Sequence, residues 1–329
     1  MIGHGVTARI QDVAAQAGVS TATVSRVLSG VDNVSEALTE RVWKAVTDLD
    51  YRPNRVARRL RRPGREMWAL IVPDVENRFF TSVARGVEEV ANEYDITVFI
   101  GNTDYDPDRL KRYLSTALAE QVAGIILAPS SPTDDVSDVL ASQIPIVTVD
   151  QTLTSRSLTT VMTDHYEGGR MAGQHLRDRG YERIGVIAGP QHSPEWNTRL
   201  EGLQSSISPE SIVATERGDN RVGGGGTAMG RLLDTHPDLE AVFVTNNLMT
   251  IGALREIDLR ALRVPEDVYV VGYDLNSQEW TRAVPVSTVN QDPRRIGEVA
   301  ARTLIDSGGL PQERHTILLE PHLEESIAL

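Results

Sequence analysis

From Trp68 onward the chain alternates short apolar runs with segments in which apolar residues recur at helical spacing. The runs are rich in β-branched residues, which is typical of buried strands. Alternating strands and helices of this length imply right-handed crossovers and parallel sheets covered on both faces. Because about 260 residues of this pattern exceed one hydrophobic core, we expect an α/β body of two doubly wound parallel-sheet lobes. The predicted strands are 68–73, 96–100, 124–128, 146–149, 184–188, 241–245 and 269–272, and the predicted helices are 80–94, 110–120, 168–179 and 249–255.

One segment of the body, 208–226, has an unusual composition because it ends in four consecutive Gly residues. A glycine-rich loop can cradle phosphate groups, but the Gly-x-x-x-x-Gly-Lys pattern of such loops does not occur in the chain. We therefore expect this segment to be a flexible loop.

The charge of the chain is unevenly distributed along its 329 residues. The net charge of −13 alone argues against a nucleic-acid partner, because a polyanion repels an acidic protein. Residues 1–65, however, carry 11 Lys and Arg against 6 Asp and Glu, a net +5, whereas the other 264 residues carry 22 against 40, a net −18. Seven of the basic residues lie within 52–65, without an acidic residue between them. This division indicates either a basic arm for a polyanion or a solvated basic linker.

The first fifty residues predict three short helices. Residues 10–17 carry apolar side chains at the i, i+3, i+4 and i+7 positions, and Gly18 follows where a helix favours a left-handed residue. Ser20 is placed to cap a second helix, 21–28, and Ser35 to cap a third that covers the first two. The apolar stripe of the third helix is Leu38, Val42, Ala45, Val46 and Leu49. Two helices joined by a short turn containing Gly match the helix-turn-helix unit of DNA-binding proteins.

The second of these helices would carry the side chains that read DNA. When such a helix enters the major groove, its first turns meet the base edges, which assigns Thr21, Ala22 and Arg26 to the bases. Arg26 can bind guanine bidentately, whereas Thr21 and Ala22 offer only short contacts, such as one to a thymine methyl group. Thr23 and Ser25 are better placed for phosphate oxygens, which position a protein without specifying sequence. The alternative is an exposed helix start without a partner.

These residues, in this order, resemble the amino-terminal domain of the lactose-repressor family. The resemblance runs without gaps over about fifty residues through 10–30, 34–36 and 51–60, and departs from the family at Arg9, where a Thr helix cap is usual. It implies that 54–60 is a hinge helix, too short to be stable alone, which folds against its twin in a dimer and wedges Leu60 into the minor groove. The DNA-contacting residues it implies are Ser20, Thr21, Ala22, Thr23, Ser25, Arg26, Asn33, Tyr51, Asn54, Arg55, Ala57, Arg58 and Leu60.

Polar and aromatic side chains follow the predicted strands of the body. Open parallel sheets bind ligands beyond the carboxyl ends of their strands, and a cleft between two lobes would collect several such ends. These loops supply carboxylates and amides for hydroxyl groups, one Arg, and aromatic rings for the face of a sugar or base. That is the composition of a site for a small polyhydroxylated ligand. Each Asn or Asp, taken alone, could instead serve a local turn.

The body also resembles the effector core of the same family, which is similar to periplasmic binding proteins. The resemblance implies a set of effector-binding residues, and the set is most similar to that of pentose binders, in which paired Phe residues sandwich the ring. The sequence departs from that pattern at Gln151, where ribose-type sites carry Arg, at Asn247, where Asp is usual, and at 275–276, where an acid-rich stretch is usual. The loss of a bidentate cation at position 151 argues against ribose itself. The implied residues are Asn77, Phe79, Phe80, Asp150, Gln151, Arg199, Asn246, Asp274 and Gln291.

Other function classes find little support. The absence of Cys excludes disulfides, thiolate metal sites and a cysteine nucleophile. The seven His residues show no metal-ligand spacing, and the chain has no Gly-x-Ser-x-Gly elbow. We therefore expect no enzymatic activity, no cofactor and no metal. No run approaches the apolar length of a membrane span and the first residues do not read as a signal peptide, so we expect a cytoplasmic protein without a membrane partner.

Together these features predict a ligand-responsive transcription regulator that acts as a homodimer, with a tetramer left open, on a pseudo-palindromic operator. A carbohydrate-like effector bound between the lobes, with a pentose or nucleoside type favoured, would release it from DNA. The alternatives are a regulator whose DNA binding is tightened by a small ligand or a phosphoprotein, a transport-type sugar-binding protein, and an α/β enzyme acting on nucleotides or sugars. The expected parts are a helix-turn-helix domain (1–52), a hinge helix and linker (53–65), an N-lobe (66–163 plus 292–320) and a C-lobe (164–291 plus 321–329).

Overall fold

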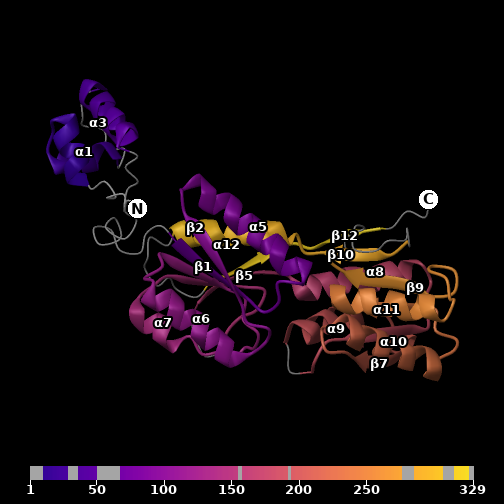
Figure 1. Cartoon of the computed structure of the whole chain (residues 1–329). Coiled ribbons are helices and arrows are strands. Elements are labelled where there is room, and N and C mark those ends of the chain that lie inside the picture. The colour runs from indigo at the N-terminus through magenta and orange to yellow at the C-terminus, as the bar shows by residue number, and fades with distance from the viewer. Residues whose placement is uncertain are drawn as a thin grey trace, which may run out of the picture. The chain divides into compact units, whose positions relative to one another are not determined.

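A computed structural model of the chain describes residues 10–28, 36–49, 67–154, 158–191, 194–275, 285–306 and 315–325. The chain divides into two compact units, Met1–Gly64 and Arg65–Leu329, and each is described by itself (Figure 1). None of the helices in these ranges is long and apolar enough to cross a membrane.

The described part of the first unit consists of α1 (Ile10–Ala17), α2 (Thr21–Leu28) and α3 (Glu36–Asp48), the three helices that the sequence predicts. Gly18 takes the left-handed conformation, with φ of 62°, at the end of α1. The Ser20 hydroxyl accepts a hydrogen bond from the backbone N–H of Thr23 at 3.1 Å, which caps α2 as predicted. The three helices share a small core made of Val13, Ala14, Ala17, Val24, Val27, Val42 and Ala45.

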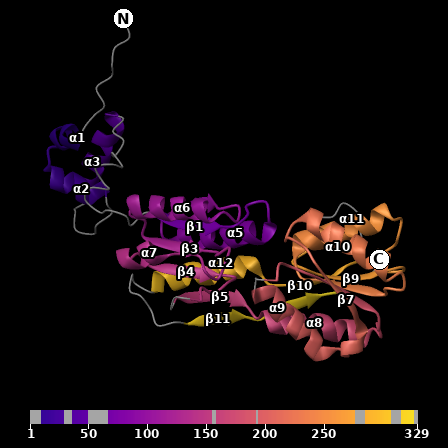
Figure 2. The same ribbon diagram turned by 90° about the horizontal axis from the view of Figure 1, so that it is seen from below.

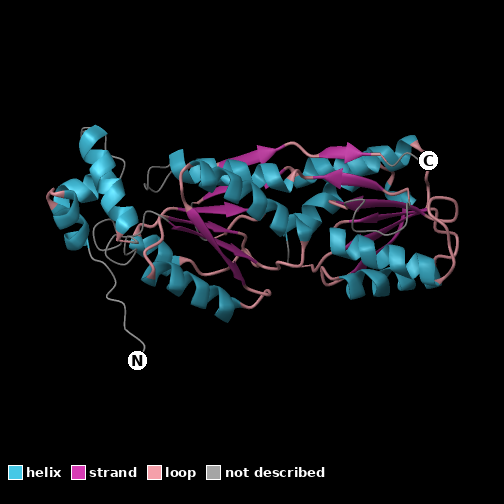
Figure 3. Cartoon of the chain, turned by 45° about the horizontal axis from the view of Figure 1, so that its top comes forward, coloured by secondary structure: helices cyan, strands magenta, loops and turns pink. Residues whose placement is uncertain are grey.

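The second unit holds two sheets, each with helices on both faces (Figure 3). In the first, the strands are β1 (Met67–Val72), β2 (Thr97–Asn102), β3 (Gly124–Leu127), β4 (Ile146–Val149), β5 (Thr159–Thr163) and β11 (Thr316–Leu319), and the helices are α5 (Arg78–Glu93), α6 (Pro107–Ala119), α7 (Ser137–Ser142) and α12 (Pro293–Asp306). In the second, the strands are β6 (Ile184–Ala188), β7 (Ile212–Arg217), β8 (Ala241–Val244), β9 (Tyr269–Tyr273), β10 (Ser287–Asn290) and β12 (His322–Glu324), and the helices are α8 (His165–Asp178), α9 (Pro194–Ser206), the short 3-10 helix Pro209–Ser211, α10 (Val222–Thr235) and α11 (Asn247–Leu259).

We call these two assemblies the first and second lobes. The first sheet has the order β11-β5-β4-β3-β1-β2, and its neighbouring strands are parallel. The second has the order β12-β10-β9-β8-β6-β7, and its strands are parallel except β12, which is antiparallel to β10. The predicted α/β body of two doubly wound lobes is therefore confirmed.

Successive residues of the central strands pack against helices on opposite faces of each sheet. In β1, Leu70 lies in the core beneath α5 and α12, whereas Ile71 lies in the core beneath α6 and α7. In β6, Ile187 packs beneath α10 and α11, whereas Val186 packs beneath α8 and α9. Figure 2 shows the pair α10 and α11 on one side of the second sheet and α8 on the other. Burial on both faces explains why these strands are almost uniformly apolar.

Within the described ranges the chain passes between the lobes three times. β5 of the first lobe leads into α8 of the second, β10 leads back into α12, and β11 leads into β12. The hydroxyl of Thr163, the last residue of β5, donates a hydrogen bond to the carbonyl of Gln291, just after β10, at 3.3 Å. Two of the three passages therefore lie side by side.

The glycine-rich segment is not the flexible loop that the sequence predicts. Residues 223–226 form the first turns of α10, which packs along α11. A Cβ atom at Gly225 would lie 2.3 Å from the backbone oxygen of Met249, and one at Gly252 would lie 2.0 Å from that of Val222. The glycines allow the two helix backbones to approach closely, and this packing outweighs the low helix propensity of Gly.

Candidate functional site

A cavity of about 270 Å³ lies between the two lobes and is lined by residues of both. Asp150 and Gln151 follow β4, Asn246 follows β8 and Asp274 follows β9, so the carboxyl ends of strands from both sheets meet there. All nine residues that the sequence assigns to the effector line this cavity: Asn77, Phe79, Phe80, Asp150, Gln151, Arg199, Asn246, Asp274 and Gln291.

Several of these residues shape the local backbone as well as the cavity. The side-chain oxygens of Asn77 and Asn246 accept backbone N–H bonds at 3.0 Å in the first turns of α5 and α11, which makes both residues helix caps. Asp150 and Asp274 take left-handed conformations, with φ of 68° and 44°. Such backbone strain at residues other than Gly is concentrated at binding sites. These Asn and Asp residues therefore serve local turns and helix caps, as the sequence leaves open, and line the cavity as well.

Arg199 is the central cation of the site and is 2% exposed. Its Cζ atom lies 4.6 Å from the ring centroid of Trp196 and 3.9 Å from that of Tyr273. The guanidinium donates to the side-chain oxygen of Gln291 at 2.9 Å and to a backbone carbonyl just after β8. Burial, together with the nearby guanidinium, lowers the pKa of His165 to about 3, so this imidazole is neutral. Arg199 is therefore a fixed positive charge whose donors are largely occupied within the protein.

Carboxyl groups surround this cation, of which Glu195 is buried and Asp150 and Asp274 are half-buried. Burial raises the pKa of Asp150 to about 6, although Arg199 acts in the opposite direction. Burial, and secondly the repulsion of Asp150, raises the pKa of Glu195 to about 7. Burial also raises the pKa of Asp274, which accepts a hydrogen bond from the backbone N–H of Gln291 at 2.9 Å. These groups do not form a metal centre: within the described ranges no three His, Asp or Glu side chains are grouped to hold a metal ion.

Four side-chain atoms around the cavity are buried without a hydrogen-bond partner. Gln151 Nε2 donates to Glu195 Oε1 at 2.8 Å, which leaves Gln151 Oε1 and Glu195 Oε2 unpaired. Trp196 Nε1 and Asn220 Oδ1 are also unpaired. Both atoms lie close to Gly189, because a Cβ atom at that position would be 2.6 Å from the first and 2.7 Å from the second. Unpaired buried polar atoms are rare, because they lose hydration without compensation. The cavity is therefore suited to a polar ligand that supplies donors and acceptors.

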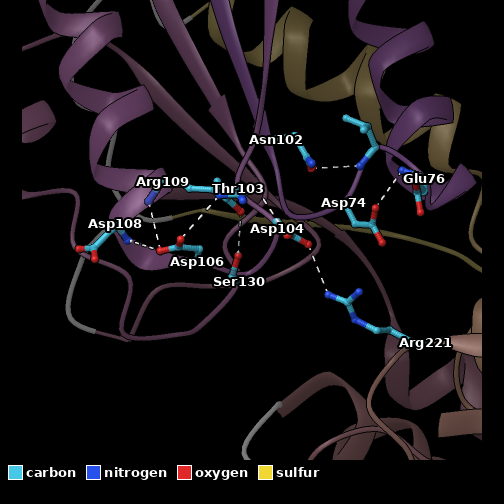
Figure 4. A network of polar contacts seen from close by, with 11 residues as sticks. Asp74, Glu76, Asn102, Thr103, Asp104, Asp106, Asp108, Arg109, Ser130 and Arg221 are labelled. Carbon is cyan, nitrogen blue, oxygen red and sulfur yellow. Dashed lines mark hydrogen bonds and ion pairs between the residues drawn. The ribbon is translucent and has the colours of Figure 1, made fainter. Parts of the chain in front are cut away.

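Two further contacts join the lobes around the cavity. Asn247 Nδ2 donates to Asn77 Oδ1 at 2.8 Å. Figure 4 shows the second contact, in which Arg221 of the second lobe reaches Asp104 on the loop after β2, with a nitrogen–oxygen distance of 3.3 Å. Asp104 and Tyr105 have consecutive left-handed conformations, with φ of 53° and 58°. The strained loop thus presents one residue to the ion pair and the next to the cavity.

The cavity also contains residues that the sequence does not single out. Tyr105 and Ser130 come after β2 and β3, so the strand-end rule points to their loops but not to these side chains. Asp219, Asn220 and Arg221 follow β7, a strand that the sequence prediction placed in a loop.

The sequence does not single out Glu195, whereas it marks Asn247 as a departure from the pentose-binder pattern. Glu195 directly precedes Trp196 at the start of α9, and Asn247 follows Asn246 at the start of α11. The position of Glu195 in a first helical turn beyond a strand is the signal that could have found it.

The candidate DNA-contacting residues are described only in part. In α2, Thr21 is exposed and Thr23 is half-buried, and the Ser20 hydroxyl is engaged in the helix cap. The backbones of Ala22, Ser25 and Arg26 lie in α2, but their side chains lie outside the described parts. The remaining predicted contacts, which include the hinge helix, also lie outside the described residues: Asn33, Tyr51, Asn54, Arg55, Ala57, Arg58 and Leu60.

Comparison with known proteins agrees with both units. Residues 9–54 match the family model of bacterial regulatory proteins of the lacI family, and residues 68–308 match that of the periplasmic binding protein domain. The HTH-type transcriptional repressor PurR of Mannheimia succiniciproducens is 32% identical over 323 residues, which cover 96% of this chain and 97% of the relative. This chain belongs to the LacI family. The family resemblance inferred from the sequence is therefore confirmed, and the protein is a DNA-binding transcriptional regulator.

Two further comparisons agree with this assignment. The ribose operon repressor of Halalkalibacterium halodurans is 32% identical over 298 residues, covering 90% of this regulator and 89% of the relative. The crystal structure of the lac repressor dimer bound to operator and the anti-inducer ONPF matches with a TM-score of 0.84 and 26% identity, covering 98% of each chain. The LacI-family regulator thus matches its relatives over both the helix-turn-helix domain and the α/β body.

Proposed function

We propose that this LacI-family regulator is a homodimer that represses transcription from a pseudo-palindromic operator, and that a carbohydrate-like effector of pentose or nucleoside type releases it. The observation that supports an effector is the convergence of nine sequence-predicted residues on one cavity with unpaired polar atoms. Hydroxyl groups both donate and accept hydrogen bonds, and the unpaired atoms of the cavity include acceptor oxygens as well as the N–H donor of Trp196. Phe79 and Phe80, whose ring centroids lie 5.1 Å apart at 87°, add apolar faces. One relative is named as the repressor of a ribose operon, which supports a ligand of this class.

The coupling between effector and DNA is proposed to run through the spacing of the lobes. A ligand that prefers one spacing shifts the population of dimers able to bind DNA, in proportion to its difference in affinity for the two states. The parts we assign to this mechanism are the reading head (1–52), the hinge and linker (53–65), the N-lobe (66–163 plus 292–320) and the C-lobe (164–291 plus 321–329). We propose a cytoplasmic location, with no catalytic residue, cofactor or membrane partner.

The role of the hinge can be tested with Leu60→Ser. If Leu60 wedges into the minor groove, the variant should bind operator roughly tenfold more weakly or worse, because the bent DNA loses the contact that stabilises it. The measurement is a gel shift with a duplex selected by the chain from a random pool, at several salt concentrations. Leu259→Ser, at a position 81% exposed at the end of α11, is the matched control and should bind normally. Unchanged operator affinity of Leu60→Ser would contradict the hinge assignment.

The same assay separates the alternatives. An effector that tightens operator binding would identify a corepressor. A chain that shows no sequence-specific binding, and whose DNA affinity lacks a steep dependence on salt, would favour a binding protein without a regulatory role.

A further inference from the structure

The most specific chemistry of the cavity lies in the contact between Gln151 and Glu195. The two side chains come from different lobes and are 8% and 4% exposed. Gln151 Nε2 donates to Glu195 Oε1 at 2.8 Å, which leaves Gln151 Oε1 and Glu195 Oε2 without a partner. Because burial raises the pKa of Glu195 to about 7, the carboxylate is ionised above that pH, and both oxygens can then only accept. A ligand group at this place must therefore donate two hydrogen bonds.

The charge of the lining restricts the ligand further. The carboxyl groups are those of Asp150, Glu195, Asp219 and Asp274, and the guanidinium groups are those of Arg199 and Arg221. Arg199 is held between two aromatic rings by internal hydrogen bonds, and Arg221 is paired with Asp104. Both of these guanidinium groups are thus engaged within the protein, and the carboxyl groups that outnumber them among the described lining residues repel a phosphate or carboxylate of the ligand when they are ionised.

We propose that Gln151 and Glu195 determine specificity by binding an amino group of the effector, and that phosphorylated ligands are rejected. The inference rests on the proposed effector site and names the group that the site reads. One amino nitrogen carries two N–H donors and can satisfy both oxygens at once, whereas a hydroxyl has a single hydrogen. A carbonyl oxygen in the same place would face two acceptors and leave all three unpaired. Two sources share this chemistry, the exocyclic amine of a nucleoside and the amino group of an amino sugar.

The test uses pairs of ligands that differ at this group, measured at pH 8, where Glu195 is ionised. In the two nucleoside pairs the neighbouring ring nitrogen also changes from an acceptor to an N–H donor, whereas in the sugar pair only the amino group is replaced. Titration calorimetry of the full chain compares cytidine with uridine, adenosine with inosine, and glucosamine with glucose, and adds cytidine monophosphate. In at least one pair the amino member should bind roughly ten- to a hundredfold more tightly, which is the effect of a hydrogen bond to a charged group. Whether that pair is a nucleoside pair or the sugar pair identifies the source. The phosphate ester should bind more weakly than its nucleoside.

Two variants tie the preference to the proposed residues. Glu195→Gln preserves shape but exchanges an acceptor for a donor, so the ratio within the pair should fall towards one. Glu201→Gln, at an exposed position on the same helix, is the matched control and should retain the preference. Four results would each overturn this inference and leave the effector site standing. Two concern the pairs: equal binding within each pair, or tighter binding of the oxo or hydroxyl members. The others are a preference that survives Glu195→Gln and binding of cytidine monophosphate as tight as that of cytidine. If no member of any pair binds, both proposals fail.

Discussion

Replacing Glu195 by Gln should stabilise the ligand-free chain in alkaline solution. Burial, and secondly the neighbouring Asp150, raises the pKa of Glu195 from 4.5 to about 7. The folded chain therefore holds this proton more tightly than the unfolded chain does. The resulting stabilisation is fully present below about pH 4.5 and is lost as the pH rises through about 7.

The expected magnitude follows from this pKa. A tenfold change in proton affinity is worth about 1.4 kcal/mol, so an ionised Glu195 costs on the order of 3 kcal/mol at pH 8 and less than about 1 kcal/mol at pH 5. Glu195→Gln removes this cost. The new amide oxygen can still accept the hydrogen bond from Gln151 Nε2. A substitution that weakens the site should thus strengthen the fold, as is common where binding sites store unfavourable interactions.

The assay is urea unfolding of the full chain at pH 5 and pH 8, with the free energy of unfolding compared between variant and wild type. The gain from Glu195→Gln should be about 3 kcal/mol at pH 8 and should shrink towards zero at pH 5. The exposed Glu201→Gln should stay within about 0.5 kcal/mol of wild type at both pH values. A gain that does not depend on pH, or a loss of stability at pH 8, would refute the assignment of a buried, proton-retaining carboxyl group to Glu195.

Three other substitutions test the packing and the electrostatics of the second unit. Gly225→Ala places a Cβ 2.3 Å from the backbone of α11 and should lower the free energy of unfolding by roughly 1–3 kcal/mol. Gly223→Ala, in the same helix with nothing within 4 Å of its Cβ, should instead raise it by up to about 1 kcal/mol. Equal effects in urea unfolding would contradict the close approach of the helices. Arg199→Ala removes the buried cation that faces the half-buried Asp150 and Asp274, together with its own hydrogen bonds, and should cost roughly 3–5 kcal/mol at neutral pH in the same assay. A smaller loss at pH 5 than at pH 8 is expected, since protonated carboxyl groups no longer need the cation, and a loss that grows at low pH would argue against this explanation.

The apolar strands of the body could be predicted from the sequence to within one or two residues. The predicted runs 146–149 and 184–188 coincide with β4 and β6, because strands buried on both faces are almost uniformly apolar and end abruptly at polar loops. The helices of the first unit were equally clear, because Gly18 and Ser20 mark where one ends and the next begins.

Other elements could not be predicted because neighbours in the fold stabilise them. β5 contains three Thr residues in five, and its burial depends on β4 and β11 on either side. β7 is a half-exposed strand at the edge of its sheet, without an apolar run. In α10, the glycines that suggest a loop are required by the contact with α11, which is invisible along the sequence.

Some residues of the candidate site could likewise be predicted from the sequence, and others could not. Residues that follow predicted strands, such as Asp150, Asn246 and Asp274, could be assigned because parallel topology brings strand ends together. The pairing of Gln151 with Glu195 joins two lobes across 44 residues of sequence, and no spacing rule predicts it. The determinant of specificity that we propose therefore required the three-dimensional arrangement.

The central claim is that effector and operator bind to coupled sites on one molecule, and reciprocity tests it most directly. The affinity of the full chain for its selected duplex should be measured with and without a saturating concentration of the tightest ligand from the calorimetric panel. The affinity for that ligand should then be measured with and without saturating duplex. The account predicts that the ligand weakens duplex binding by some factor, roughly 5- to 150-fold, and that the duplex weakens ligand binding by the same factor, because linkage requires it. Affinities that do not change in either direction would contradict the account.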